Sequence, residues 1–171
     1  ALIQVFNKNT KLRTLLGIEE GVTELNLSEK NVDPGQAKIL AAELKASRAA
    51  AVVKKVALSQ NKLFGARRWG EHTIDADQSG WSALCEALPS SPVEELDVAD
   101  VGMGVKGVTS LAKAISAGAA PSSLTLAGNP LTGAIYKDYR WQNIDSLSPP
   151  VILDQTIEQE ITTLSEWLKR S

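Results

Sequence analysis

The sequence of 171 residues contains a single cysteine, Cys85, and a single histidine, His72. One thiol cannot form a disulfide within the chain, and this pair alone cannot supply the Cys and His ligands of a zinc site. A nucleophile that needs a histidine base would depend on His72, and no serine or aspartate can be assigned to act with it. We therefore expect a protein that is not an enzyme and that holds no metal and no cofactor.

An excess of charge and long apolar runs are also lacking. The chain has 18 Lys and Arg residues against 20 Asp and Glu residues, a net charge of −2. This balance argues against nucleic-acid or membrane-surface binding driven by net electrostatics. No apolar run approaches the roughly 18 residues of a transmembrane helix. We therefore expect no membrane span.

Aromatic residues are scarce, with four Trp, two Tyr and two Phe, whereas Leu and Ala each occur 21 times. A core made mostly of Leu and Ala suggests thin layers of similar size, as in repeat proteins. Four segments do share one pattern, L-x-x-L-x-L-x-x-N-x-L, and they span residues 22–32, 53–63, 93–103 and 121–131. Self-similarity of this kind is the signature of a solenoid.

The four copies resemble the leucine-rich repeat, and specifically the long-repeat, ribonuclease-inhibitor-like class; the resemblance covers roughly residues 18–135. It implies an α/β fold, a leucine-rich repeat solenoid. This would be a short horseshoe of about four strand–helix repeats, with a parallel sheet on the concave face and helical caps. Relatives in this class often bind proteins on that face.

The residues support the same reading. Leu25 and Leu27 lie two apart, so both point to one side of a strand. Asp33 can cap a helix that begins with Pro34. Each strand–helix unit is too small to bury its apolar face alone, and stacked neighbours would share a continuous core. The predicted inward stripes of the three helices are Ile39, Leu40 and Leu44; Trp81, Leu84, Cys85 and Leu88; and Val108, Leu111, Ala112 and Ile115.

The predicted organisation is a single domain over residues 1–171, with an N-terminal cap in 1–20 and repeats in 21–131. The second unit is longer than its neighbours and carries an insertion at about residues 64–80. Residues 132–171 are predicted as a long loop and a C-terminal capping helix from about Asp154 to Lys169. The chain starts at Ala1 rather than Met, which is compatible with a removed targeting segment, and we expect an intracellular protein.

The asparagine of the pattern, its ninth position, is present in only two copies, as Asn61 and Asn129. In the family this side chain holds the turn by hydrogen-bonding to neighbouring backbone. The first copy has Lys30 there and the third has Val101. We expect those two turns to be satisfied in another way.

Two further motifs compete with the repeat interpretation. Residues 102–107 fit the G-x-G-x-x-G pattern of dinucleotide sites, but the acid expected about 20 residues on is missing. Residues 75–80, followed by Glu86, fit the spacing of a calcium loop, although the segment before them is a poor helix. Ser79 is also a good N-cap for a helix, which is the simpler reading of that loop. Cys85 aligns with Ala41 and Ala112 and is predicted to be a buried packing residue.

The first candidate surface is the outward face of the strands. From the first strand to the fourth, the outward residues of each strand are acidic, basic, acidic and neutral. The face is either a solvated sheet surface with weak ion pairs or a mildly acidic binding surface. Its candidate residues are Glu24, Asn26, Lys54, Lys55, Glu94, Glu95, Asp97 and Thr125.

The second candidate surface is an aromatic edge. It would be formed by the insertion at about residues 64–80 and by a second insertion after Leu131, which leave the repeat at the same place. Trp, Tyr and Arg are enriched in interface hot spots, and long loops are often functional. The alternative is that the loops pack on each other and bury their aromatic side chains. The candidate residues are Phe64, Arg67, Arg68, Trp69, Tyr136, Tyr139, Arg140 and Trp141.

From these patterns we expect a non-catalytic protein–protein interaction scaffold, a subunit or adaptor in a larger assembly, with protein partners and no nucleic acid. A regulatory protein acting on a small GTPase is one alternative, which the resemblance suggests and no residue matches. A calcium-responsive binding module is another, and it rests only on the segment from Asp75 to Glu86.

Overall fold

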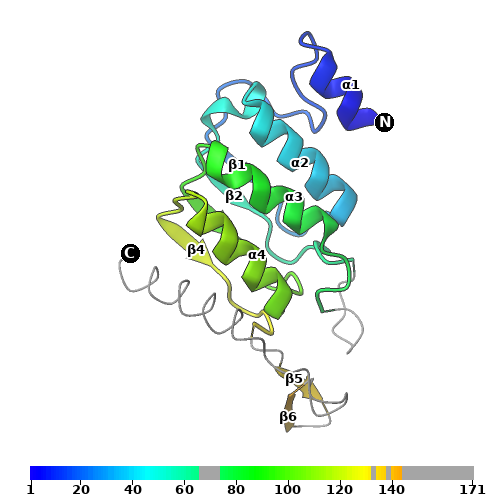
Figure 1. The fold of residues 1–171 in the computed structure, drawn as a ribbon, viewed down its shortest axis with the longest axis vertical. Helices are drawn as coiled ribbons and strands as arrows, with labels where there is room; N and C mark the ends of the chain where they lie inside the picture. Colours follow the sequence, from blue (N-terminus) through cyan, green and yellow to red (C-terminus); the bar gives the residue numbers. More distant parts are fainter. Residues whose placement is uncertain (66–73, 132–133, 138–139, 144–171) are drawn as a thin grey trace.

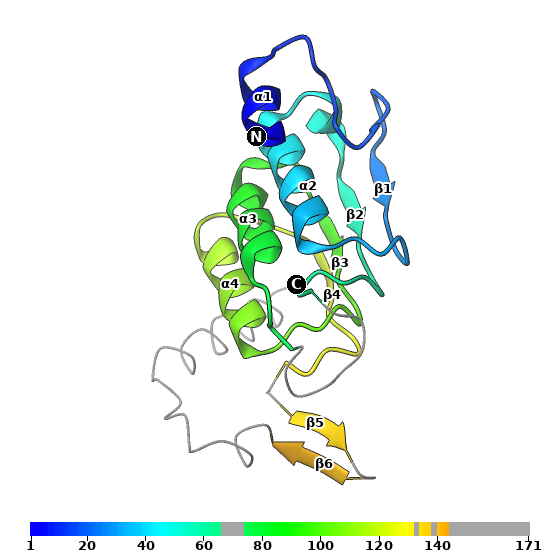
Figure 2. The same ribbon diagram turned by 90° about the vertical axis from the view of Figure 1, so that its right-hand side faces the viewer.

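The computed structural model of the chain describes residues 1–65, 74–131, 134–137 and 140–143. Four strands form a parallel sheet (Figure 1), and their spatial order follows the sequence, as the labels in Figure 2 show. The strands are β1 (Glu24–Asn26), β2 (Lys55–Ala57), β3 (Glu95–Asp97) and β4 (Ser123–Thr125). Their central residues Leu25, Val56, Leu96 and Leu124 are register partners.

A helix follows each of the first three strands, as parallel pairing requires a crossover connection. These helices are α2 (Pro34–Ala46), α3 (Ser79–Ala87) and α4 (Val105–Ser116), and α1 (Leu2–Lys8) precedes the sheet. Short 3₁₀ helices, η1 (Ala49–Val52) and η2 (Leu88–Ser90), lead into β2 and β3. Figure 2 shows α2, α3 and α4 side by side on one face of the sheet. The expected α/β class is therefore confirmed.

The core lies between the sheet and these helices. The stripes predicted from the sequence are buried, except that Ile39 and Ile115 are only half-buried. Trp81 is fully buried, and its indole N–H donates to the carbonyl of Gly107 at 2.8 Å, so the bulkiest core residue has its polar atom satisfied. Helices α2 and α3 approach closely at Gly80, where a Cβ would lie 2.5 Å from the Pro34 carbonyl oxygen.

The start of α2 follows the sequence prediction. Asp33 is the N-cap, its side chain accepts from the Gln36 backbone N–H at 2.8 Å, and the Gln36 side chain accepts from the Asp33 N–H at 3.0 Å. The start of α3 differs from the prediction. Ser79 is the first helical residue rather than the N-cap, and its N–H is bound by Asp77 Oδ1 at 2.8 Å.

The backbone hydrogen bonds between strands recur from one strand pair to the next. At the start of each pair, one carbonyl oxygen accepts from two successive N–H groups of the following strand segment. The carbonyl of Thr23 accepts from the N–H groups of Lys54 and Lys55. In the same way, the carbonyl of Lys54 accepts from Glu94 and Glu95, and the carbonyl of Glu94 accepts from Ser122 and Ser123. Just past the strands, the equivalent residues Glu29, Gln60, Asp100 and Gly128 all have positive φ.

Two asparagines hold the turns after the strands. Asn61 is fully buried; its amide donates to the carbonyls of Leu27 and Leu58, both at 2.8 Å, and its oxygen accepts from the Val32 N–H at 2.9 Å. Asn129 binds Val101 in the same manner. Each asparagine therefore binds the backbone of the turn in the preceding segment. The two preceding turns are those that have Lys30 and Val101 in place of an asparagine of their own.

The N-terminal segment is fixed to α2 by two charged side chains. The carboxylate of Glu43, only 2% exposed, accepts from the Thr14 hydroxyl and from the N–H groups of Leu15 and Leu16. The guanidinium of Arg48 lies 4.4 Å from the Phe6 ring centroid and donates to three carbonyls, those of Phe6, Asn9 and Leu12. The N-terminal segment is thus held by a buried acceptor on α2 and by a half-buried donor just after this helix.

The expectation of a long loop from residue 132 is wrong for its first part. Strands β5 (Ala134–Lys137) and β6 (Arg140–Asn143) pair as an antiparallel two-stranded sheet. The run contains Ile135, Tyr136 and Trp141, residue types that favour strands. The helix predicted from Asp154 to Lys169 lies outside the described residues.

Candidate functional site

The strands turn one set of side chains away from the helices, and we call this surface the open strand face. Alternation explains the residues within the strands, because Leu25, Val56, Leu96 and Leu124 point into the core and their immediate neighbours point outward. Lys54, Glu94 and Ser122 come just before their strands and are exposed as well. No helix of the described chain covers this side of the four-stranded sheet (Figure 2). Its side chains are exposed or half-buried: Glu24, Asn26, Lys54, Lys55, Ala57, Glu94, Glu95, Asp97, Ser122, Ser123 and Thr125.

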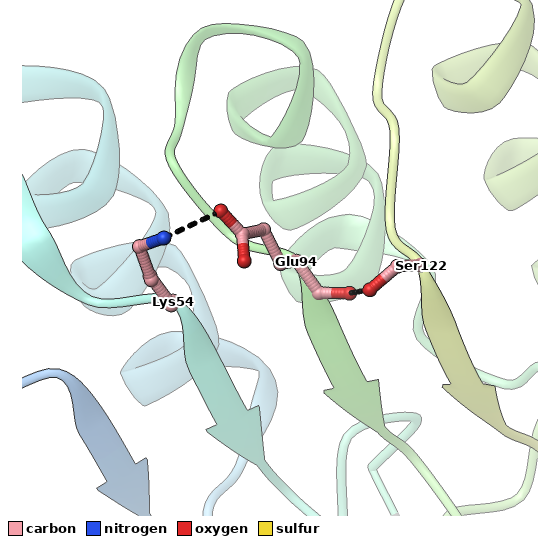
Figure 3. A network of polar contacts seen from close by, with 3 residues as sticks. All are labelled: Lys54, Glu94 and Ser122. Carbon is pink, nitrogen blue, oxygen red and sulfur yellow. Dashed lines mark hydrogen bonds and ion pairs between the residues drawn. The ribbon is translucent and has the colours of Figure 1, made fainter.

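The face contains a row of polar contacts where the strands begin (Figure 3). The Lys54 ammonium lies 2.8 Å from Glu94 Oε1, and the Ser122 hydroxyl donates to the Glu94 backbone carbonyl at 3.1 Å. Both charged side chains of this pair are more than half exposed, at 58% and 53%. Pairs of this kind contribute only about 0–1 kcal/mol, so they shape the charge pattern more than the stability.

The second row of the face places one cation between two acids. Lys55 Nζ lies 3.5 Å from Glu95 Oε2 and 3.9 Å from Glu24 Oε2. These three residues are direct register partners on β1, β2 and β3. Both lysines of the face therefore have carboxylate partners within the face, as the alternation of signs in the sequence predicted.

The third row differs, because Asp97 forms no ion pair with any described residue. Asp97 Oδ1 accepts from the Ala99 N–H at 3.0 Å, and Asn26 Oδ1 accepts from the Ser28 N–H at 3.0 Å. Such side chain to backbone bonds fix the direction of both residues. Ala57 is the register partner of both and lies between them, so small Ala57 separates two oriented polar side chains.

The aromatic edge is only partly described. Phe64 is fully buried and lies 5.9 Å from the Trp81 ring, centroid to centroid, so it belongs to the core. This corrects its prediction as a binding residue of the aromatic edge. Arg67, Arg68, Trp69, Tyr139 and His72 lie outside the described residues. Tyr136 is the register partner of Trp141, and Arg140 is that of Lys137, across β5 and β6.

Asp75, which the sequence placed in a calcium loop, has a different role. Its carboxylate accepts from three backbone N–H groups in the first turn of α4: Gly104 at 2.9 Å, Lys106 at 2.8 Å and Gly107 at 3.1 Å. A Cβ on Gly104 would lie 2.6 Å from the Asp75 carboxylate. Gly104 and Gly107 of the G-x-G-x-x-G motif thus make room for an internal acid at a helix N-terminus.

Asp77 and Cys85, the other candidate residues in this region, also have contacts or surroundings within the fold. Hydrogen bonds from the side chain and then the backbone of Ser79 lower the pKa of Asp77. Within the part of the chain that the structure describes, no group of three His, Cys, Asp or Glu residues is arranged to hold a metal ion. Cys85 is buried, as predicted, and burial raises the pKa of its thiol. A buried, protonated thiol is a poor nucleophile.

No helix in the described ranges has the length and hydropathy needed to cross a membrane. Comparison of the chain with protein-family models and with curated proteins finds no match.

Proposed function

We propose that the chain is a leucine-rich repeat solenoid of the ribonuclease-inhibitor-like class and acts as a non-catalytic protein–protein interaction scaffold. In this proposal the open strand face binds a protein partner. Support for the repeat comes from the recurring backbone hydrogen bonds, the shared positive φ past each strand, and the stacking of α2, α3 and α4. Each of these features is what one supersecondary unit would repeat along a solenoid.

The observation that carries the proposal is a parallel sheet with one side left open among the described residues. Parallel sheets occur almost only with both faces covered. Here the side chains away from the helices are polar apart from Ala57. In the Lys55–Glu24 and Lys55–Glu95 pairs, 44% to 71% of the surface of each charged side chain is exposed. A solenoid uses such a surface for binding.

A role as one subunit of a larger assembly is supported by the first helix. Leu2 and Val5 of α1 are 53% and 55% exposed, and they lie one turn apart on the same side of the helix. Exposed apolar side chains on α1 are a surface that a neighbouring subunit would cover.

Blocking the face tests the proposal. We would immobilise the chain, capture partners from native extract, identify a stoichiometric complex by mass, and then measure binding of that partner to Ser123→Trp. Ser123 is exposed on β4, and its side chain makes no hydrogen bond with any residue that the structure describes. We expect the bulky side chain to weaken binding by about tenfold or more, as steric blocks at interface centres do.

The matched control is Ser116→Trp, which makes the same change at an exposed residue on the helical side, at the end of α4. It should leave binding unchanged. Equal loss in both variants, or loss in Ser116→Trp alone, would contradict the assignment of binding to the open strand face. Thermal unfolding of each variant shows whether the fold is intact.

A further inference from the structure

From the charges of the open strand face, we infer that its partner presents a basic protein segment and that Asp97, beside Ala57, receives an arginine or lysine side chain. The inference rests on the proposed function, because it names the partner chemistry of the same surface. It concerns specificity, which the proposed function leaves undefined.

The first step is the charge balance of the face. Four carboxylates stand against two ammonium groups: Glu24, Glu94, Glu95 and Asp97 against Lys54 and Lys55. Both ammonium groups already lie within 4 Å of carboxylates of the same face. An acidic partner would therefore meet excess negative charge and no unpaired cation, whereas a basic partner would meet carboxylates in excess.

The second step locates the excess. Lys54 is matched by Glu94, and Lys55 is shared by Glu24 and Glu95. Asp97 is the remaining acid of the face, and no described cation pairs with it. One of its oxygens is bound by the Ala99 N–H, which leaves Oδ2 for an incoming donor.

The third step is the shape of that row. Ala57 lies between Asn26 and Asp97 in the register, so a methyl group separates two longer polar side chains. Thr125, the partner of Asp97 on β4, adds an exposed hydroxyl. A guanidinium or ammonium group placed over Ala57 would reach the Asp97 carboxylate on the neighbouring strand, an acceptor that suits its donors, whereas Thr125 lies one strand further away.

The test uses the full chain and an oligo-arginine peptide as probe, with an oligo-glutamate peptide of equal length for comparison. Backbone amide shifts recorded during titration map the contact residue by residue. We expect the oligo-arginine peptide at low salt to shift the amides of Ala57, Asp97 and Ala99, and the oligo-glutamate peptide to leave them unchanged.

Two variants with the same change in net charge sharpen the test. Asp97→Asn removes the charge but keeps an oxygen that can bind the Ala99 N–H; Glu86→Gln removes an exposed charge from the helical side. Asp97→Asn should weaken oligo-arginine binding by about threefold, the scale of one exposed charge pair. Glu86→Gln should leave it unchanged.

Equal weakening by both variants would mean attraction to net charge alone and would overturn the inference. So would contacts confined to the helices, absence of binding, or binding of the oligo-glutamate peptide at the same amides. The proposed function is judged separately: if Ser123→Trp blocks the captured partner but Asp97→Asn does not weaken it, the face binds a protein and the basic-segment inference fails. If Ser123→Trp has no effect, the surface itself is wrong.

Discussion

The side chain of Asn129 lies against the backbone of Val101, the residue at the equivalent position of the preceding segment. Asn129 Oδ1 accepts from the N–H groups of Val101, Gly102 and Met103 at 3.0 to 3.1 Å, and its amide donates to the carbonyls of Val98 and Leu126. One asparagine therefore satisfies two successive turns. Asn61 plays the same part for the turn that contains Lys30.

This relationship makes Asn61 a strong determinant of stability. Asn61→Ala would leave the carbonyls of Leu27 and Leu58 and the N–H of Val32 without their partner in a fully buried place. We expect a loss of about 2–4 kcal/mol in the free energy of unfolding, measured by urea denaturation. Asn7→Ala, at an exposed residue of α1, should change it by less than about 0.5 kcal/mol. A loss below about 1 kcal/mol for Asn61→Ala would contradict this role.

Glu43 is predicted to hold the N-terminal segment. Glu43→Ala removes a buried acceptor of the Thr14 hydroxyl and of the Leu15 and Leu16 N–H groups, so we expect a destabilisation of about 2–4 kcal/mol. Hydrogen exchange should quicken at Leu15 and Leu16 more than in β2 and β3. Glu86→Ala, an exposed acid on α3, is the control. Unchanged exchange at Leu15 and Leu16 would show that other contacts fix this segment.

Asp75 and Gly104 should be energetically coupled. Asp75→Ala removes the acceptor of three N–H groups at the start of α4, which should cost about 1–2 kcal/mol, as the loss of a helix cap does. Gly104→Ala places a Cβ 2.6 Å from the Asp75 carboxylate, so it should destabilise the chain as well. The double variant, measured by urea denaturation, should lose less than the two single losses combined. Additive losses would mean that the carboxylate does not occupy this place.

Cys85 gives a prediction for alkaline pH. Its ordinary pKa of 9.0 is raised in the folded chain by burial, so above pH 9.0 the unfolded thiol ionises while the folded thiol stays protonated. The thiol's contribution to stability is complete below pH 9.0 and is lost above it, by at most about 1.4 kcal/mol per pH unit. Comparison of the chain with Cys85→Ala across pH isolates this contribution, and a constant difference between them above pH 9.0 would contradict it. A thiol reagent should react only after denaturation.

Much of the strand–helix order can be predicted from the sequence, because its signals are local. Asp33 followed by Pro34 predicts the start of α2, and the apolar spacing predicts the buried sides of α2, α3 and α4. The contact of Asp75 with Gly104 joins residues 29 positions apart, and neither motif around them indicates it. An aspartate this far from a glycine-rich turn gives no local signal in the sequence, so the contact is found only in the structure.

Part of the candidate site can likewise be predicted from local signals in the sequence, and part cannot. The alternation along the strands predicts that Glu24, Lys55 and Glu95 face outward, and the ion pairs of Lys55 follow from it. The pair of Lys54 with Glu94 joins residues just before the strands. The sequence does not predict the burial of Phe64, because an aromatic residue at the start of an insertion has no local sign of burial. Its place is set by Trp81 and by Gly107, whose missing Cβ would lie 2.9 Å from the Phe64 ring.

The central claim is that a protein partner binds the open strand face, and site-specific photo-crosslinking tests it most directly. A photoreactive amino acid at Thr125, exposed on β4, is compared with the same residue at Ser116, exposed at the end of α4. We expect the partner to be crosslinked from Thr125 and not from Ser116. Crosslinking from Ser116 with none from Thr125 would contradict the account.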